Sequence, residues 1–447
     1  MTSPSVYVCF NLSRTVGVLL FALLCSGAFS QVRPGTTSST LQTEFIFPVQ
    51  DQHAHGSTLV ELSNGDLLVG WFQGSGERWA DDVRVMGSRK KKGQAEWSAP
   101  FLLADVEEFP DCNPVLFIDT KNRLWLMWIT IIANQWETSL IKYKISDNYL
   151  DTAGAPTWNW QDTLLLKPGG KTERGIQAND PFVASVQRQV KDYTAAIAAD
   201  PAQRPYLERW TQHAARLVSM ARGENMMRAG RVLAEDGKVD ETQLGYPYFR
   251  RMGWQTRNKP FITKNGRMIV PLYSDGFSFS LMAYTDDAGE NWKTSTPLVG
   301  GGNIQPAIAA TASGELVAYM RDNGGAPKRL HVSRSSDQGQ TWSLVHDSEL
   351  PNSGTACDII TLPNGNWVLI NNDTVSGRNR LTVSLSEDNG KSWRYHKQIA
   401  DDATTRSHYP AIIAGADGRI HVSYSHFDAN DKKAIKHAVF DETWIRQ

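Results

Sequence analysis

The sequence predicts an all-β protein, a six-bladed β-propeller with an inserted α-helical hairpin. Three observations support this fold: an eight-residue pattern that occurs three times, a turn-and-strand pattern that occurs six times, and a content of 15 Trp and 35 Gly residues. Self-similarity at a period of about 50 residues is typical of propellers and solenoids, in which each repeat is one supersecondary unit. The hydrophobic fraction of 41% is sufficient for the core of a soluble protein.

The eight-residue pattern lies at 285–292, 335–342 and 386–393, where it reads TDDAGENW, SSDQGQTW and SEDNGKSW. The final tryptophans are 50 and 51 residues apart. Ser, Thr and Asp side chains can bond the amides of a turn, and Gly adopts positive φ without steric cost. The Trp is expected to fill the apolar layer between neighbouring repeats. The pattern therefore predicts the fold rather than the active site.

The turn-and-strand pattern places Asn-Gly, Asp-Gly or a similar turn before a run of β-forming residues. Its six copies lie at 63–71, 121–128, 264–270, 313–319, 363–369 and 417–423. Such turns before apolar or alternating β-formers are a strong hairpin signal. Six copies predict six blades.

The second and third copies are separated by roughly 90 surplus residues, and part of this segment has a helical period. Apolar residues recur at steps of three and four at Val183, Val186, Val190, Tyr193 and Ile197, and again at Leu207, Trp210, Ala214, Leu217 and Ala221. The period predicts a helical hairpin over residues 176–235. Insertions on a propeller face often shape the binding site, although a packing or dimer element fits the pattern equally well.

The N-terminus is typical of a secretion signal. Arg14 precedes an apolar run at 16–24, and small residues at Ala28 and Ser30 bracket Phe29 before a cleavage site near Gln31. We therefore expect residues 1–30 to be removed, leaving a propeller over 31–447 that is secreted or periplasmic. The apolar run is shorter than the roughly 20 residues that a membrane-spanning helix needs, so no span is expected after cleavage.

The composition also excludes several classes of partner. A net charge of -1 gives no electrostatic reason to expect a nucleic acid. Apart from His53 and His55 the histidines are scattered, so no metal site is expected. No motif points to a redox cofactor or to a phosphate-cradling loop, and no cofactor is expected.

These repeats resemble those of the sialidase (neuraminidase) superfamily, whose six-bladed propellers carry BNR or "Asp box" turns. The resemblance spans residues 50–440 apart from the insertion. It implies a secreted exo-glycosidase that hydrolyses a terminal acidic sugar, sialic acid or a related one, from a glycan. In that family three arginines grip the substrate carboxylate, and a Tyr acts as the nucleophile because an anionic nucleophile would be repelled.

Matching the family's early motifs assigns residues in the first blade. The first arginine position holds His55, with His53 close by, and a histidine is charged only conditionally near neutral pH. Asp82 fits the position of the general acid/base, and Arg78 is the arginine that accompanies it. Asp81 and Asp82 face opposite ways if the strand has begun, so one of them enters the pocket.

Matching the later motifs assigns the remaining residues. Tyr409 is the counterpart of the nucleophile and Arg321 that of the second arginine. The third arginine is Arg378 or Arg380, which share one face of a strand, and we favour Arg380.

Two departures from the family pattern concern carboxylates. The glutamate that activates the tyrosine is replaced by Gln305, which can orient a phenol but cannot take its proton. Near residues 424–426, where the family has a glutamate that holds the first arginine, this chain has no carboxylate. Loss of both the first arginine and its partner is consistent, because an unpaired buried glutamate is costly.

Two alternatives to the glycosidase remain open. A polysaccharide lyase or another uronate-directed enzyme would remove the proton α to a uronate carboxylate while arginine neutralises that carboxylate. Its parts would be His53, His55, His408, Tyr409, Arg321 and Arg380. A non-catalytic carbohydrate-binding propeller is the other alternative. In each case the expected partner is an acidic glycan or polysaccharide.

Overall fold

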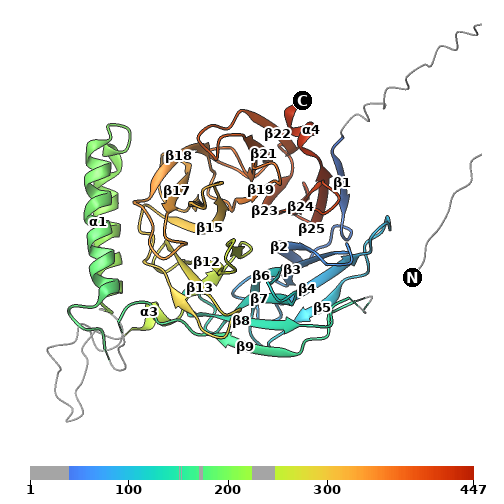
Figure 1. The fold of residues 1–447 in the computed structure, drawn as a ribbon, viewed down its shortest axis with the longest axis horizontal. Coiled ribbons are helices and arrows are strands. Elements are labelled where there is room, and N and C mark those ends of the chain that lie inside the picture. The colour runs from blue at the N-terminus through green and yellow to red at the C-terminus, as the bar shows by residue number, and fades with distance from the viewer. Residues whose placement is uncertain (1–39, 151, 153, 171–174, 224–246) are drawn as a thin grey trace, which may run out of the picture. The chain divides into compact units, whose positions relative to one another are not determined.

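Six antiparallel sheets are arranged in a ring and follow one another in chain order (Figure 1). The computed structural model describes residues 40–150, 152, 154–170, 175–223 and 247–447. Within each sheet the strands pair with their neighbours in sequence, apart from β1 in the last sheet and the branch at β11 in the third. The prediction of a six-bladed β-propeller is confirmed.

The strands of the first three blades precede residue 295. Blade 1 consists of β2 (His53–Glu61), β3 (Leu67–Gly74), β4 (Arg84–Lys90) and β5 (Phe101–Ala104). Blade 2 consists of β6 (Asp111–Ile118), β7 (Leu124–Ile131), β8 (Ser139–Ser146) and β9 (Trp160–Leu164). Blade 3 consists of β10 (Trp254–Thr256), β11 (Phe261–Ile262), β12 (Met268–Ser274), β13 (Phe279–Thr285) and β14 (Lys293–Thr294). Both β10 and β11 pair with β12, so the first strand of blade 3 is split.

The last three blades complete the ring. Blade 4 consists of β15 (Asn303–Ala310), β16 (Leu316–Asp322), β17 (Arg329–Ser335) and β18 (His346–Pro351). Blade 5 consists of β19 (Asp358–Thr361), β20 (Trp367–Asn371), β21 (Arg380–Ser386) and β22 (Tyr395–Asp401). Blade 6 consists of β23 (Arg406–Ala414), β24 (Ile420–Phe427), β25 (Lys433–Phe440) and β1 (Gln42–Phe45). Strand β1 pairs with β25, so blade 6 joins both ends of the described chain.

The turn at 386–393 shows how the repeated pattern stabilises a blade. The Asp388 carboxylate accepts a hydrogen bond from the Ser392 amide at 2.8 Å, and the Ser386 hydroxyl accepts one from the Gly390 amide at 2.8 Å. Trp393 is buried and lies edge-on to the ring of Tyr319, with a centroid distance of 5.7 Å. The polar residues therefore hold the turn, and the Trp packs between blades 4 and 5.

Two helices occupy the predicted insertion, α1 (Pro181–Ala199) and α2 (Leu207–Ala221), with the short helix η2 (Arg204–Tyr206) between them. Helix α1 lies beside the ring in Figure 1. Gln189 fastens it there, because its side-chain amide donates to the Pro297 carbonyl at 2.8 Å and accepts from the Val299 amide at 3.0 Å. The part of the predicted 176–235 range that begins at residue 224 lies outside the described residues.

Three short helices complete the described chain: η1 (Trp136–Thr138), α3 (Tyr248–Arg251) and α4 (Glu442–Arg446). The predicted secretion signal, residues 1–30, lies outside the described residues. Among the helices that are described, none has the length and apolar character that crossing a membrane requires.

Candidate active site

The first strands of four blades are interrupted by the same irregularity. In β2, β6, β15 and β23 the pairing register shifts at a residue with positive φ. These residues are Gly56, Asn113, Gln305 and Tyr409. A bulge re-aims a side chain, and a left-handed conformation is costly for residues other than Gly, so such positions are typical of functional sites.

Tyr409 is surrounded by three guanidinium groups. Arg321 Nη1 donates to Tyr409 Oη at 2.6 Å. The guanidinium carbons of Arg257 and Arg378 lie 5.2 and 5.5 Å from the centre of the Tyr409 ring. Positive charge in this position can neutralise negative charge that develops on the phenol oxygen.

Arg257 was not identified from the sequence, and it lies in the gap between β10 and β11. It is buried, donates from Nη1 to the Ser57 carbonyl at 3.2 Å, and donates from Nη2 to the Pro410 carbonyl at 3.0 Å. Its guanidinium therefore links blades 1, 3 and 6 next to the Tyr409 ring. The split first strand of blade 3 places it there.

Of the two arginines that the sequence left open, Arg378 lies beside Tyr409. Arg380, which the sequence analysis favoured, begins β21, and its side chain is 41% exposed and pairs with Asp401 at 3.2 Å. The two residues are opposite each other in the register of β21 and β22, which explains that ion pair. Arg378 forms no ion pair with a carboxylate in the described part of the chain.

His55 and His408 also contact Tyr409. The ring centroid of His55 lies 4.3 Å from that of Tyr409 and 4.9 Å from that of His408. Burial, together with neighbouring positive charges, holds the pKa of both imidazoles well below the ordinary value of 6.5. Both are therefore neutral at neutral pH. His53 lies further out, with Nε2 3.2 Å from Glu77 Oε1.

Ser425 holds His55 in place. The Ser425 hydroxyl lies 2.9 Å from His55 Nδ1 and also accepts a hydrogen bond from the Gly56 amide at 3.1 Å. Ser425 lies in the segment 424–426, where the resemblance to sialidases expected the partner of the first arginine. A neutral His–Ser pair thus stands where that family has an Arg–Glu pair.

Gln305 contacts Arg321 and Tyr273. Its carbonyl oxygen accepts from Arg321 Nη1 at 3.4 Å, and its amide donates to Tyr273 Oη at 3.3 Å. Tyr273 in turn donates to Gln255 Oε1 at 3.0 Å and accepts from Asn113 Nδ2 at 3.1 Å. Burial raises the pKa of Tyr273 well above 10, so it is a neutral phenol that orders this network. None of Tyr273, Gln255 and Asn113 was identified from the sequence.

Two carboxylates, Asp82 before β4 and Asp275 after β12, have opposite environments. Asp82 is exposed; partial burial alone would raise its pKa, but hydrogen bonds from the Ser75 amide and hydroxyl lower it. Asp275 accepts a hydrogen bond from Gln255 Nε2 at 2.8 Å, and burial raises its pKa above 3.8. The pKa of Asp275 is thus shifted in the opposite direction to that of Asp82, and the sequence did not identify Asp275.

The loop that carries Asp82 is held against blade 2. The Arg78 guanidinium lies 5.2 Å from the ring of Trp79 and 5.5 Å from that of Trp136. Asn134 donates to the Asp81 carboxylate at 3.1 Å. Over the ranges that the structure describes, no group of His, Cys, Asp and Glu side chains has the arrangement of a metal site.

The chain matches one family model, that of the BNR repeat-like domain, over residues 65–190 and 198–422. Among curated proteins, it is 24% identical to the anhydrosialidase of Macrobdella decora over 192 residues, which are 37% of this chain and 24% of that protein. It is 29% identical to a sialidase of Bacteroides fragilis over 128 residues, 27% of this chain and 23% of that protein. Each of these matches spans about a quarter of the length of the curated relative.

Among solved structures, the intramolecular trans-sialidase of Ruminococcus gnavus is similar with a TM-score of 0.56 at 14% identity, covering 88% of this chain and 96% of that one. At this identity the likeness concerns the fold alone. The family match covers most of the chain, including all six blades in part. The chain therefore belongs to the BNR repeat-like family, as a divergent propeller of the sialidase superfamily.

Proposed function

We propose that this protein is a glycosidase that releases a terminal acidic sugar, with sialic acid as the first candidate. The observation that carries the proposal is the hydrogen bond from Arg321 to Tyr409 Oη at 2.6 Å, next to the guanidinium of Arg378. Cations beside a reactive phenol favour an anionic substrate and stabilise charge on the phenol oxygen. The sialidase relatives of this chain are consistent with such a substrate.

Arg321 and Arg378 are the proposed ligands of the substrate carboxylate. Arg378 has no acidic partner among the described residues, and Arg321 Nε is buried without a hydrogen-bond partner there. A buried donor without a partner costs free energy, and a bound carboxylate would satisfy it. Arg257 already donates to two backbone carbonyls, so its proposed role is not to bind substrate but to place positive charge beside the Tyr409 ring.

In the proposed reaction Tyr409 Oη forms a bond to the anomeric carbon while the glycosidic C–O bond breaks. His55 is the proposed base for the Tyr409 proton, because it is neutral and adjacent and because Gln305 cannot accept a proton. A carboxylic acid protonates the leaving oxygen, and water then hydrolyses the tyrosyl intermediate. The two candidates for that acid are Asp82 and Asp275.

A second candidate function is β-elimination on a uronate polysaccharide. The observation that favours it is the neutral pair His55 and His408 beside Tyr409 and the unpaired Arg378. Arg378 would neutralise the uronate carboxylate and thereby acidify the α proton, which a histidine or Tyr409 would remove. The glycosidic C–O bond at the β carbon breaks in this step, and another of these side chains would protonate the leaving oxygen. The product would carry a carbon–carbon double bond, whereas hydrolysis creates none.

The test is an activity screen of the secreted chain on a fluorogenic sialoside, sialyllactose and uronate polysaccharides, with ultraviolet detection of unsaturated products. Tyr409→Phe is expected to lower kcat by about 10³-fold, since it removes the reacting oxygen. The matched control is Tyr424→Phe, because the buried Tyr424 hydroxyl has no hydrogen-bond partner in the described structure. Glycan binding without turnover in wild type, unchanged in Tyr409→Phe, would refute an enzyme and indicate a binding propeller.

The proton donor is identified by comparing Asp82→Asn with Asp275→Asn. Loss of the acid slows substrates with a poor leaving group, while a reporter with an acidic phenol leaving group is spared. The variant that shows this split carries the acid. If both variants slow the two substrates equally, neither carboxylate is the donor.

A further inference from the structure

A cavity of about 320 Å³ lies between the helical hairpin and the loops of blades 3 and 4. Helix α1 contributes Tyr193, and α2 contributes Arg209, His213 and Arg216. The facing wall is formed by loop segments 275–278, 301–302 and 323–327. This volume lies within the range of sites that bind a sugar-sized ligand.

Two lining residues of the cavity are hydrogen-bonded to residues of the candidate active site. Asn323 lines the cavity and accepts a hydrogen bond from Arg321 Nη2 at 3.2 Å. Asp275 also lines the cavity and is bonded to Gln255 of the Tyr273 network. A ligand that fills the cavity would therefore lie next to the proposed catalytic centre.

The cavity wall carries cations without partners. Arg209 and Arg216 are about two turns apart on α2, and neither pairs with a carboxylate over the part of the chain that is described. His213 Nε2 is buried there without a hydrogen-bond partner. Three polar groups on one side of the cavity thus lack partners that a ligand could supply.

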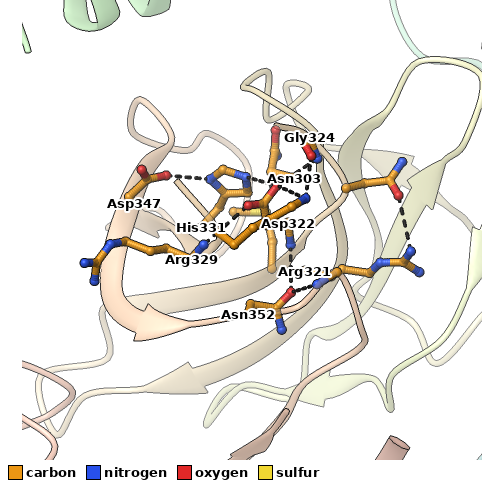
Figure 2. A network of polar contacts seen from close by, with 12 residues as sticks. Asn303, Arg321, Asp322, Gly324, Arg329, His331, Asp347 and Asn352 are labelled. Carbon is orange, nitrogen blue, oxygen red and sulfur yellow. Dashed lines mark hydrogen bonds and ion pairs between the residues drawn. The ribbon is translucent and has the colours of Figure 1, made fainter. Parts of the chain in front are cut away.

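The carboxylates of the wall, in contrast, are already bonded within the protein. Asp347 lies 3.1 Å from His331 Nδ1 and accepts from Gln203 at 3.3 Å, and His331 also faces Asp322 (Figure 2). Asp275 is bonded to Gln255 at 2.8 Å. The groups left for a ligand are therefore predominantly basic, which favours an anionic one.

We infer that this cavity is a subsite for an anionic sugar on the leaving-group side of the bond to be cleaved. The substrate would then carry a second acidic group, a carboxylate or a sulfate, on the sugar next to the terminal one. Arg209 and Arg216 bind that group, and Tyr193 and Tyr206 offer aromatic surface to the sugar ring. The inference rests on the proposed function for its position in the reaction.

Binding to the secreted chain is measured by calorimetry with three probes: tetragalacturonate, its methyl ester, and a chondroitin sulfate tetrasaccharide. Wild type is expected to bind at least one of the two acidic probes. Arg209→Ala and Arg216→Ala are each expected to weaken that binding by about 10-fold, since each removes a charge-assisted hydrogen bond. The methyl ester, which lacks the charge, is expected to bind both variants and wild type alike.

The matched control is Arg188→Ala, because Arg188 is exposed on α1 and does not line the cavity. It is expected to bind the acidic probes as wild type does. If wild type binds neither acidic probe, or if the Arg209 and Arg216 variants bind as tightly as Arg188→Ala, the inference is wrong. Preference for one acidic probe identifies the carboxylate or the sulfate as the group recognised.

A kinetic measurement separates this inference from the proposed function. With an acidic oligosaccharide substrate, Arg209→Ala is expected to raise KM, while kcat/KM on a simple aryl sialoside stays that of wild type. Binding is also measured on Tyr409→Phe. If wild type shows Arg209-dependent binding but turns over none of the substrates, the glycosidase is refuted and the subsite is retained. If wild type turns over substrate but binds the acidic probes independently of Arg209, the subsite is refuted and the glycosidase is retained.

Discussion

His331 provides the sharpest prediction of a pH effect on stability. It is 4% exposed in β17, with Nδ1 3.1 Å from an oxygen of Asp347 and Nε2 3.6 Å from an oxygen of Asp322. Burial alone would lower its pKa, but the two carboxylates raise it from 6.5 to about 9. Figure 2 shows the imidazole between the two acids, close to the strand end that carries Arg321.

The magnitude follows from this shift. Raising the pKa from 6.5 to about 9, at about 1.4 kcal/mol for each pKa unit, means that the protonated imidazole contributes about 3 to 4 kcal/mol to the free energy of unfolding. Because the pKa is higher in the folded state, this contribution is complete below pH 6.5 and is lost as the pH rises through about 9. The stability of wild type should therefore fall across this interval.

The perturbation is His331→Gln, which removes the titrating group. The assay is urea unfolding of the protein at a series of pH values from below 6.5 to above 9. The variant is expected to be less stable than wild type at low pH, and the difference should shrink as the pH rises. His346→Gln, which replaces an exposed histidine of the adjacent β18, is the control and should follow wild type. Parallel pH profiles for His331→Gln and wild type would refute the reasoning.

Two further substitutions test the site and the fold. Ser425→Ala removes the hydrogen bond to His55 and should lower kcat/KM by about 5-fold, the equivalent of about 1 kcal/mol. The control is Ser423→Ala on the same strand, which should leave kcat/KM unchanged because the buried Ser423 hydroxyl has no partner in the described structure. Equal kcat/KM values for the two variants would contradict the role of Ser425. Gly390→Ala places a Cβ against the Tyr319 hydroxyl at a residue with a φ of 76°. It should lower the free energy of unfolding by about 2 kcal/mol or more, measured by denaturant titration, and an unchanged midpoint would exclude this steric cost.

Much of the fold was predictable because its determinants are local. The box at 386–393 and the six turn-and-strand copies carry their own turn chemistry, so their spacing alone gave the number of blades. The helical period at Val183 to Ile197 and at Leu207 to Ala221 likewise predicted α1 and α2. Local patterns do not give the split of β10 and β11, since this depends on how the chain returns to the ring after the insertion.

The candidate site was less predictable because its residues come from different blades. Tyr409 and Arg321 were found through the motifs that surround them, and the structure brings them into contact. Arg257 and Tyr273 were missed, since their positions near the axis depend on the ring as a whole. A usable signal was present: Asn113 and Gln305, like Tyr409, each precede a proline at the start of a blade, and all three adopt positive φ there.

The closure of blade 6 by β1 has a consequence for how the candidate site is assembled. His55 and Ser425, which hold each other in the site, are 370 residues apart. During synthesis the early strand is made long before the last blade. Bringing the two together closes a long loop, and the entropic cost of that closure must be offset by the contacts between blades 1 and 6. The two histidines that contact Tyr409 come from both sides of the boundary between these blades, His55 from blade 1 and His408 from blade 6. A ligand that binds residues of both blades would hold the two ends of the ring together, so its binding is expected to raise the free energy of unfolding.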